Sequence, residues 1–260
     1  MIQTATRTRF EPRRIVTIPA GAQTHATAGK SEELLPFTVR LVSNQDELNQ
    51  AVHIRHMAYA RHLPDFAETL KTPEAADHEE GVVILLAQSK LDGSPLGTLR
   101  SQTNQFKPLS LEHSVDLPDW LQSRRLAEAT RLGVSAGTAG SLVTSVLFKA
   151  FYLYCLQVGV EWMVVTGRAP VDRTYDRMLF DDVFPGRGYI PFEHVGNLPH
   201  RVLSFNVKTG ASLWAAAKHP LYEFMVNTHH PDIDLSAPRQ SQTAHFDRST
   251  HTPSQTLFAM

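Results

Sequence analysis

The sequence lacks several features that would place it in large and well-defined classes of protein. It has one cysteine, Cys155, so no disulfide can form within the chain, and a reducing compartment such as the cytoplasm is expected. Cys155 lies in an apolar run, which favours a small core residue over a nucleophile. No Gly-x-Ser-x-Gly motif is present, and no Gly-Lys-Ser/Thr follows a glycine-rich loop, which disfavours a serine hydrolase and a P-loop protein.

Neither sign of charge predominates. The chain has 25 Lys and Arg against 26 Asp and Glu, a formal net charge of -1. No strong global field attracts nucleic acid or an anionic membrane, so any charged partner must be bound by a local patch. The 13 histidines form no HxxxH or HExxH pair in a clear helix, and we expect no metal site.

Long hydrophobic runs are also missing. The longest apolar stretch, residues 142–158, is interrupted by Lys149 and by hydroxyl residues, so no membrane span is expected. The arginine-rich start of the chain is not followed by an apolar run, which does not support a secretory signal. These absences favour a soluble cytoplasmic protein.

The periodic part of the sequence lies between two stretches with few core residues. We expect a flexible N-terminal arm at 1–36, one domain at 37–235 and a flexible C-terminal tail at 236–260. Alternating strand and helix patterns predict an α/β fold, a mixed central sheet flanked by helices. The predicted strands are 37–42, 82–88, 96–102, 127–134, 160–166 and 201–207, and the predicted helices are 44–62, 142–158 and 170–179.

Charged residues occupy unusual places in these elements. Arg55 shares a predicted helix stripe with Leu48, Val52 and Tyr59, where it either snorkels to solvent or is buried with anionic partners. An acidic segment at 77–80 is either a solvated loop or the source of those partners. The segment contains Asp77, Glu79 and Glu80, and their possible partners are Arg55, Arg100 and Arg131.

Glu128 and Arg131 lie in one predicted strand. Strict alternation places them on opposite faces of the sheet, and a bulge would change that. Glu128 is a candidate proton acceptor for an attacking amine, and a structural Glu-Arg pair is the alternative. Tyr175 is a candidate proton donor to a leaving thiolate, although tyrosines in such places more often pack at the end of a sheet.

A loop of small residues, 135–141, leads from this strand into the apolar helix. Its backbone N–H groups and the helix N-terminus are suited to a phosphate or a phosphopantetheine arm, a signal that any tight strand-to-helix turn can also give.

Six short motifs follow one another along the chain: Ile54-Arg55 with Tyr59, Asp77 with Glu80, Leu96 to Arg100, Glu128 to Val134, Leu198 to Leu203, and His219 to Pro231. In this order they resemble the acyl-homoserine-lactone synthases, and more so the related long-chain N-acyl amino acid synthases, which have the GNAT-like acyltransferase fold. Two departures argue against a homoserine-lactone product: Tyr59 stands where the acyl-homoserine-lactone synthases usually have Phe, and no Trp follows near 63–66.

The resemblance implies a bacterial acyltransferase that moves a fatty acyl group from a thioester to the α-amine of an amino acid. Acyl-ACP or acyl-CoA would be a co-substrate, and no cofactor would be permanently bound. Acyl carrier protein would dock on a basic patch such as Arg124-Arg125 or Lys149, with Arg168, Arg173 and Arg177 as other candidates. An autoinducer-type synthase using S-adenosylmethionine and a non-catalytic thioester-binding module are the alternatives.

The resemblance also implies roles for single residues. Glu128 would be the catalytic base, directly or through water, and Tyr175 is added as a catalytic proton donor from the interpretation of that residue above. Substrate binding would fall to a charged and aromatic set: Arg55, Tyr59, Asp77, Glu80, Arg100 and Arg131. The thioester and its pantetheine arm would lie against Leu132, Gly133, Val134, Ser135, Gly137, Gly140 and Ser141.

Overall fold

The computed structural model describes residues 31–137 and 140–236. The expected flexible arm and tail therefore lie largely outside the described residues. Residues 31–36, assigned to the arm from the sequence, are described, and here the structure differs from that prediction. Ser31–Glu32 form a short strand, β1, paired in parallel with β10 (Thr228–His229).

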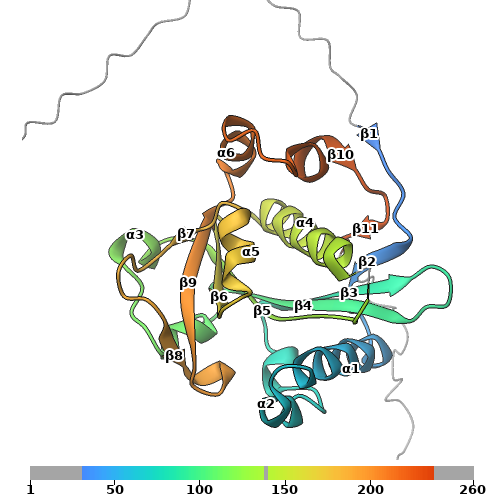
Figure 1. Ribbon diagram of the computed structural model, residues 1–260, viewed down its shortest axis with the longest axis horizontal. Coiled ribbons are helices and arrows are strands. Elements are labelled where there is room, and N and C mark those ends of the chain that lie inside the picture. The colour runs from blue at the N-terminus through green and yellow to red at the C-terminus, as the bar shows by residue number, and fades with distance from the viewer. Residues whose placement is uncertain (1–30, 138–139, 237–260) are drawn as a thin grey trace, which may run out of the picture. The chain divides into compact units, whose positions relative to one another are not determined.

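The domain is built on a nine-stranded mixed sheet with helices on both faces (Figure 1). The strand order is β11-β2-β3-β4-β5-β6-β9-β7, with β8 paired to β9. The strands from β2 to β5 form an antiparallel meander, β5 and β6 are parallel, and β9 runs antiparallel to β6. The main strands are β2 (Phe37–Leu41), β3 (Val82–Ser89), β4 (Pro95–Thr103), β5 (Leu126–Val134), β6 (Trp162–Gly167) and β9 (Leu198–Asn206).

The remaining strands are short and lie at the edges. They are β7 (Asp181–Asp182), β8 (Ile190–Phe192) and β11 (Ile233–Asp234). These pieces are too short to show a hydrophobic period of two residues, and the sequence did not predict them. The predicted mixed sheet and all six of its predicted strands are confirmed within one or two residues at most ends.

Helix α1 (Gln45–Ala60) begins at the predicted cap. The Asn44 side chain accepts a hydrogen bond from the Glu47 backbone N–H at 2.9 Å, and the Glu47 carboxylate accepts one from Ser43 N–H at 2.7 Å. The helix ends two residues before the predicted His62. Its buried stripe packs on β3, β4 and β5 from the lower face in Figure 1, with α2 (Pro64–Glu68) beside it.

Helix α4 (Gly140–Val158) covers the opposite face, with α5 (Asp172–Arg177) and α6 (Gly210–Ala216) on the same side (Figure 1). The predicted helix 170–179 is shorter than expected: α5 begins two residues after Pro170 and ends before Leu179, whose φ of 67° is left-handed and cannot continue a helix. Among the described residues, α4 alone is long and apolar enough to cross a membrane, by length and composition only. Core helices of soluble proteins pass the same test, and most of the inner face of α4 lies in the main hydrophobic core, including Cys155.

Two glycines let these helices approach the sheet from opposite faces. A Cβ atom at Gly97 of β4 would lie 2.6 Å from Val143 of α4. A Cβ atom at Gly133 of β5 would lie 3.1 Å from the Ala58 Cβ and 3.2 Å from the Arg55 Cα of α1. The close contact at Gly133 brings the buried end of α1 next to the part of β5 that carries the charged residues.

Candidate active site

A bulge between β4 and β5 organises the site. Thr98 pairs with Gly133 and Arg100 pairs with Thr130, so β5 carries one extra residue between these pairs. Arg131, inside the bulge, has φ 54°, a left-handed conformation that is uncommon for a residue with a side chain. The bulge brings the Arg131 guanidinium to the face that already carries Arg100, as both bind one carboxylate.

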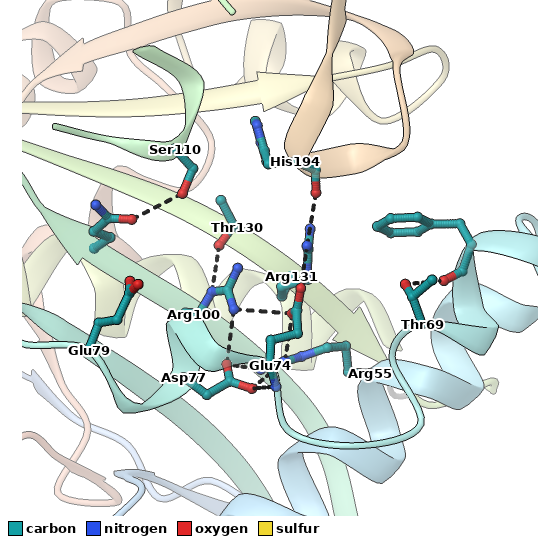
Figure 2. Close-up of polar contacts among 12 residues, drawn as sticks. Arg55, Thr69, Glu74, Asp77, Glu79, Arg100, Ser110, Thr130, Arg131 and His194 are labelled. Carbon is teal, nitrogen blue, oxygen red and sulfur yellow. Dashed lines mark hydrogen bonds and ion pairs between the residues drawn. The ribbon is translucent and has the colours of Figure 1, made fainter. Parts of the chain in front are cut away.

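Three arginines and two carboxylates form a buried cluster on this face (Figure 2). Glu74 accepts hydrogen bonds from Nε and Nη2 of Arg131, both at 2.7 Å, and from Nη1 of Arg55 and Arg100, both at 3.1 Å. Asp77 accepts from Nη1 and Nη2 of Arg55 at 2.9 and 3.0 Å, and from Arg100 at 3.0 Å. Arg55 is fully buried, so the snorkelling interpretation is wrong.

The cluster keeps both carboxylates ionised. Burial raises the pKa of Glu74, but the hydrogen bond and charge of Arg131, with the charges of Arg100 and Arg55, outweigh it and hold the pKa below its usual range. Burial likewise opposes ionisation of Asp77, and the contacts with Arg55 and Arg100 lower its pKa. Three positive and two negative charges leave the cluster with a net charge of +1, which favours an anionic ligand beside it.

Glu128 lies on the same strand but apart from this cluster. It is fully buried beneath the short helix η2 (Ser110–His113), whose Leu111 backbone N–H donates to its Oε2 at 3.2 Å. Burial raises the pKa of Glu128 to about 7, against the lowering effect of the Leu111 N–H and of Arg100. Its Oε1 lies 3.6 Å from Nε2 of His194, in the short helix η3 (Glu193–Val195).

A cavity of about 540 Å³ opens where β5 and β6 separate. Their pairing stops at Ala129 and Val165, although β5 continues to Val134 and β6 to Gly167. The walls of the cavity are formed by the end of β5 and by residues of α1, α2, α4, α5 and η3. Polar lining residues include Tyr59, Arg131, Arg168, Tyr175, His194 and His200, and apolar ones include Phe66, Leu99, Ala129, Phe148 and Val171.

Several residues predicted from the sequence meet at this place. Arg131, Tyr59, Tyr175 and the segment 132–134 line the cavity, while Arg55, Asp77 and Arg100 support it from the buried cluster. Burial raises the pKa of the Tyr175 hydroxyl, which keeps it in its protonated form.

Other predicted residues fall elsewhere. Glu80, which we expected in substrate binding, is exposed and makes no ion pair with any described residue, so it is not one of the acids that pair with the arginines. Gly140 and Ser141 belong to the first turn of α4 rather than to a loop, and residues 138–139 of that loop are not described. Lys149 is buried and hydrogen-bonded to the Phe224 and Thr228 carbonyls, so it cannot form part of a surface patch.

The sequence analysis missed Glu74, His194 and His200, and it named Arg168 for carrier-protein docking and not as a lining residue of the cavity. Glu74 is the central acceptor of the cluster, and its backbone N–H donates to the Asp77 carboxylate at 2.9 Å, at the start of the short helix η1 (Ala75–His78). Two acids three residues apart at a helix start are a local signal that could have identified it. His194 and His200 come from a region far along the chain, and no local pattern links them to Glu128. Within the described residues, no three His, Cys, Asp or Glu side chains gather as metal ligands do.

Comparisons with known proteins agree on the fold. No family model and no curated protein matches this sequence. The N-acyl amino acid synthase FeeM from uncultured soil microbes superposes with a TM-score of 0.52 at 16% identity, over 70% of this chain and 96% of that chain. BjaI, a CoA-dependent acyl-homoserine lactone synthase determined with SAM and isopentyl-CoA, gives a TM-score of 0.51 at 17% identity, over 78% and 95% of the two chains. The chain therefore has the GNAT-like α/β fold that its sequence predicts.

Proposed function

We propose that this protein is an N-acyltransferase that moves a fatty acyl group from a thioester to the α-amine of an amino acid. The observation that carries the proposal is the cavity between β5 and β6, where Arg131 and His194 lie beside apolar lining residues and His194 contacts the buried Glu128 carboxylate behind it. Arg131 Nη1 is buried in this wall and has no hydrogen-bond partner among the described residues. A guanidinium with unused donors is suited to the carboxylate of an amino-acid acceptor.

The size and lining of the cavity suit an acyl chain as the second substrate. A volume of about 540 Å³ lies within the range of small-molecule sites, which are mostly apolar with a few placed polar groups. Phe148 and Val171 line one side of the cavity, and Leu99 and Ala129 line it from the sheet. An acyl chain in this part would leave its carbonyl near the polar residues.

The thioester itself would lie along the free edge of β5. Residues 130–134 have no partner strand on the β6 side, so backbone N–H groups near Leu132 to Val134 can stabilise the oxyanion of the tetrahedral intermediate. The pantetheine arm would continue past Ser135 and Gly137 towards Gly140 and Ser141, where the first turn of α4 favours a phosphate. Tyr175, held protonated, would donate to the leaving thiolate.

The identity of the donor and the location of the protein belong to the same proposal. Either acyl-ACP or acyl-CoA would supply the acyl group in the cytoplasm. Acyl carrier protein would dock on the exposed Arg173 and Arg177 of α5, which adjoins the cavity, because Arg124 and Arg125 precede the opposite end of β5. The names of FeeM and BjaI support acyl transfer to an amine, and FeeM supports an amino acid as acceptor.

Mass spectrometry of lipid extracts tests this proposal. Cells expressing the wild type, Glu128→Gln or an empty vector would be compared. An N-acyl amino acid found with the wild type alone is the expected result, and it would identify the acceptor and the chain. An acyl-homoserine lactone with released methylthioadenosine would instead establish the autoinducer synthase. No difference from the empty vector, with folded purified protein inert towards both thioester donors, would favour a thioester-binding module without catalysis.

A further inference from the structure

Unsatisfied buried polar atoms gather around Glu128. Eight buried side-chain nitrogen or oxygen atoms have no hydrogen-bond partner among the described residues, and three of them belong to the pair of Glu128 and His194. They are Glu128 Oε1 and both ring nitrogens of His194. A buried polar atom without a hydrogen-bond partner costs free energy. Three such atoms in one contact therefore indicate a site where a bound substrate or a transferred proton supplies the missing hydrogen bonds.

The two residues have different access to the cavity. His194 lines it, whereas Glu128 is fully buried and is not among the lining residues. An amine in the cavity therefore meets the imidazole, and the 3.6 Å contact between His194 Nε2 and Glu128 Oε1 connects it to the carboxylate. This distance is longer than a hydrogen bond, as is common before substrates tighten an active site.

We infer that His194 carries protons between the cavity and the buried carboxylate of Glu128, and that it is the group in contact with the attacking amine. This inference rests on the proposed function for the identity of the amine. Glu128 then accepts the proton through His194, where the sequence led us to expect a direct contact with the amine or a bridging water.

The transfer balances in protons and electron pairs. The amine lone pair attacks the thioester carbonyl carbon, and the carbonyl π pair moves to oxygen. Nδ1 of neutral His194 takes one proton from the amine nitrogen that has bonded to the carbonyl carbon, while the Nε2 proton of His194 passes to Glu128 Oε1. When the oxygen pair re-forms the carbonyl, the C–S bond breaks with its electron pair on sulfur. A proton returned through His194, or given by Tyr175, yields the free thiol.

The charges around the pair fit this direction of transfer. Burial and the charges of Arg131, His200 and Arg100 lower the pKa of His194 to about 3, although Glu74 opposes them, so the ring is neutral at rest. Glu128, with a pKa raised by burial to about 7, holds the transferred proton at neutral pH better than an exposed carboxylate would. Two groups this close titrate as a pair, with the carboxylate as the resting place of the proton and the imidazole as the path.

Neighbouring contacts fix the position of His194. Arg131 Nη2 donates to its backbone carbonyl at 2.9 Å, and Figure 2 shows the ring extending away from that contact. The Phe192 ring packs edge-on against the imidazole, with centroids 5.7 Å apart. The Ser114 Oγ accepts from the Glu193 backbone N–H at 3.1 Å, which attaches η3 to the segment after η2. Arg131 thus links the charged cluster to the placement of His194.

The first test is kinetic and uses the purified full chain. Thiol release from dodecanoyl-CoA and from dodecanoyl acyl carrier protein is followed with a mixture of the common amino acids. His194→Ala is expected to lower the rate about 10²- to 10⁴-fold. Added imidazole is expected to raise the rate of this variant at least about tenfold, because it can occupy the space left by the missing side chain. The control is His113→Ala, an exposed histidine on η2, which should keep the wild-type rate. Unchanged activity of His194→Ala, or a loss that imidazole does not relieve, would overturn the inference.

The second test does not depend on turnover. Histidine resonances of the labelled wild type and of Glu128→Gln are followed by NMR as pH is varied, with His194→Gln used for assignment. The His194 signals of the wild type should shift near pH 7 as the pair takes up its proton, and Glu128→Gln should abolish that shift. A shift that persists in Glu128→Gln, or none in the wild type, would contradict proton sharing. If no thioester is turned over, the proposed function fails, and this titration alone decides whether the pair shares a proton.

Discussion

Arg131 and Glu74 form a bidentate ion pair at the centre of the charged cluster, with Nε and Nη2 of the arginine each 2.7 Å from one carboxylate oxygen. The pair depends on the bulge in β5, since the left-handed backbone at Arg131 turns its side chain to the face that carries Arg100. Arg131 then bridges three parts of the site: Glu74, the carbonyl of His194 and the cavity. Its one unpaired nitrogen is the donor that we assign to the acceptor's carboxylate.

Removing the charge of Glu74 should destabilise the whole domain. Glu74→Gln leaves three buried arginines with Asp77 as the single carboxylate of the cluster, and breaking a buried ion pair in this way costs about 3–5 kcal/mol. Urea unfolding followed by circular dichroism measures the change. Glu68→Gln is the matched control, because Glu68 pairs with Lys71 on the exposed surface and its loss should not move the midpoint. Equal midpoints for the two variants would show that the cluster contributes little to folding.

Glu128→Gln should make the protein more stable while it removes activity. A rise of the pKa from 4.5 to about 7 means that ionising this buried carboxylate opposes folding by about 3 kcal/mol at high pH. A neutral amide of the same shape avoids that cost, so the free energy of unfolding at pH 8 should increase by up to this amount. Thermal unfolding at pH 8 and pH 5 measures it, and the gain should vanish at pH 5. A variant that is inactive because it is less stable than the wild type would argue against the assigned role.

The dependence of wild-type stability on pH should have a maximum on the acidic side of neutrality. The folded pKa of Glu128 lies above its ordinary value, so its contribution to stability is complete below about 4.5 and is lost as pH rises through about 7. The folded pKa values of Glu74 and Asp77 lie below their ordinary values, so their contributions are present above those values and are lost as pH falls. The folded pKa of His194 also lies below its ordinary value, at about 3, so its contribution is lost as pH falls below 6.5 and offsets the gain from Glu128 in that range. Unfolding free energies measured from pH 3 to 9 should therefore peak at about pH 6–7, whereas a curve that rises steadily to pH 8 would not fit these assignments.

Lys149→Met should loosen the C-terminal part of the domain. Lys149 Nζ donates to the Phe224 and Thr228 carbonyls at 2.5 and 2.6 Å and contacts His230 Nδ1 at 2.8 Å. Methionine fills similar space but leaves two half-buried carbonyls without this donor, at a cost of about 1 kcal/mol each. Hydrogen exchange should increase in residues 223–230 with little change in β3 and β4. Protection that stays as in the wild type would mean that other contacts hold this segment.

The fold could be predicted well from the sequence because hydrophobic residues recur at regular spacing in its long helices and strands. The helix that starts at Asn44, the strands at 82–88 and 96–102 and the apolar helix 142–158 are all local patterns, and together with the motif resemblance they indicated the GNAT-like fold. The short strands β7, β8, β10 and β11 were missed, since their positions are set by contacts with distant parts of the chain.

The site was only partly predictable for the same reason. Arg55, Arg100, Glu128 and Arg131 were selected because they are charged residues within predicted helices and strands, and Asp77 because it lies in an acidic segment. Strict alternation in β5 failed where the bulge occurs. Glu80 was chosen in place of Glu74 because residue spacing could not show which acid faces the arginines. His194 reaches Glu128 from 66 positions further along the chain, in a three-residue helix that carries no pattern of its own.

The most direct test of the account is the reaction of the purified protein with a dodecanoyl thioester and a mixture of the common amino acids, followed by mass spectrometry. We predict a dodecanoyl amide at the α-nitrogen of an amino acid, formed together with free thiol by the wild type and reduced at least about 10²-fold in Glu128→Gln. Thiol release without an amide, or the same amount of amide from both proteins, would contradict acyl transfer to an amine at this site.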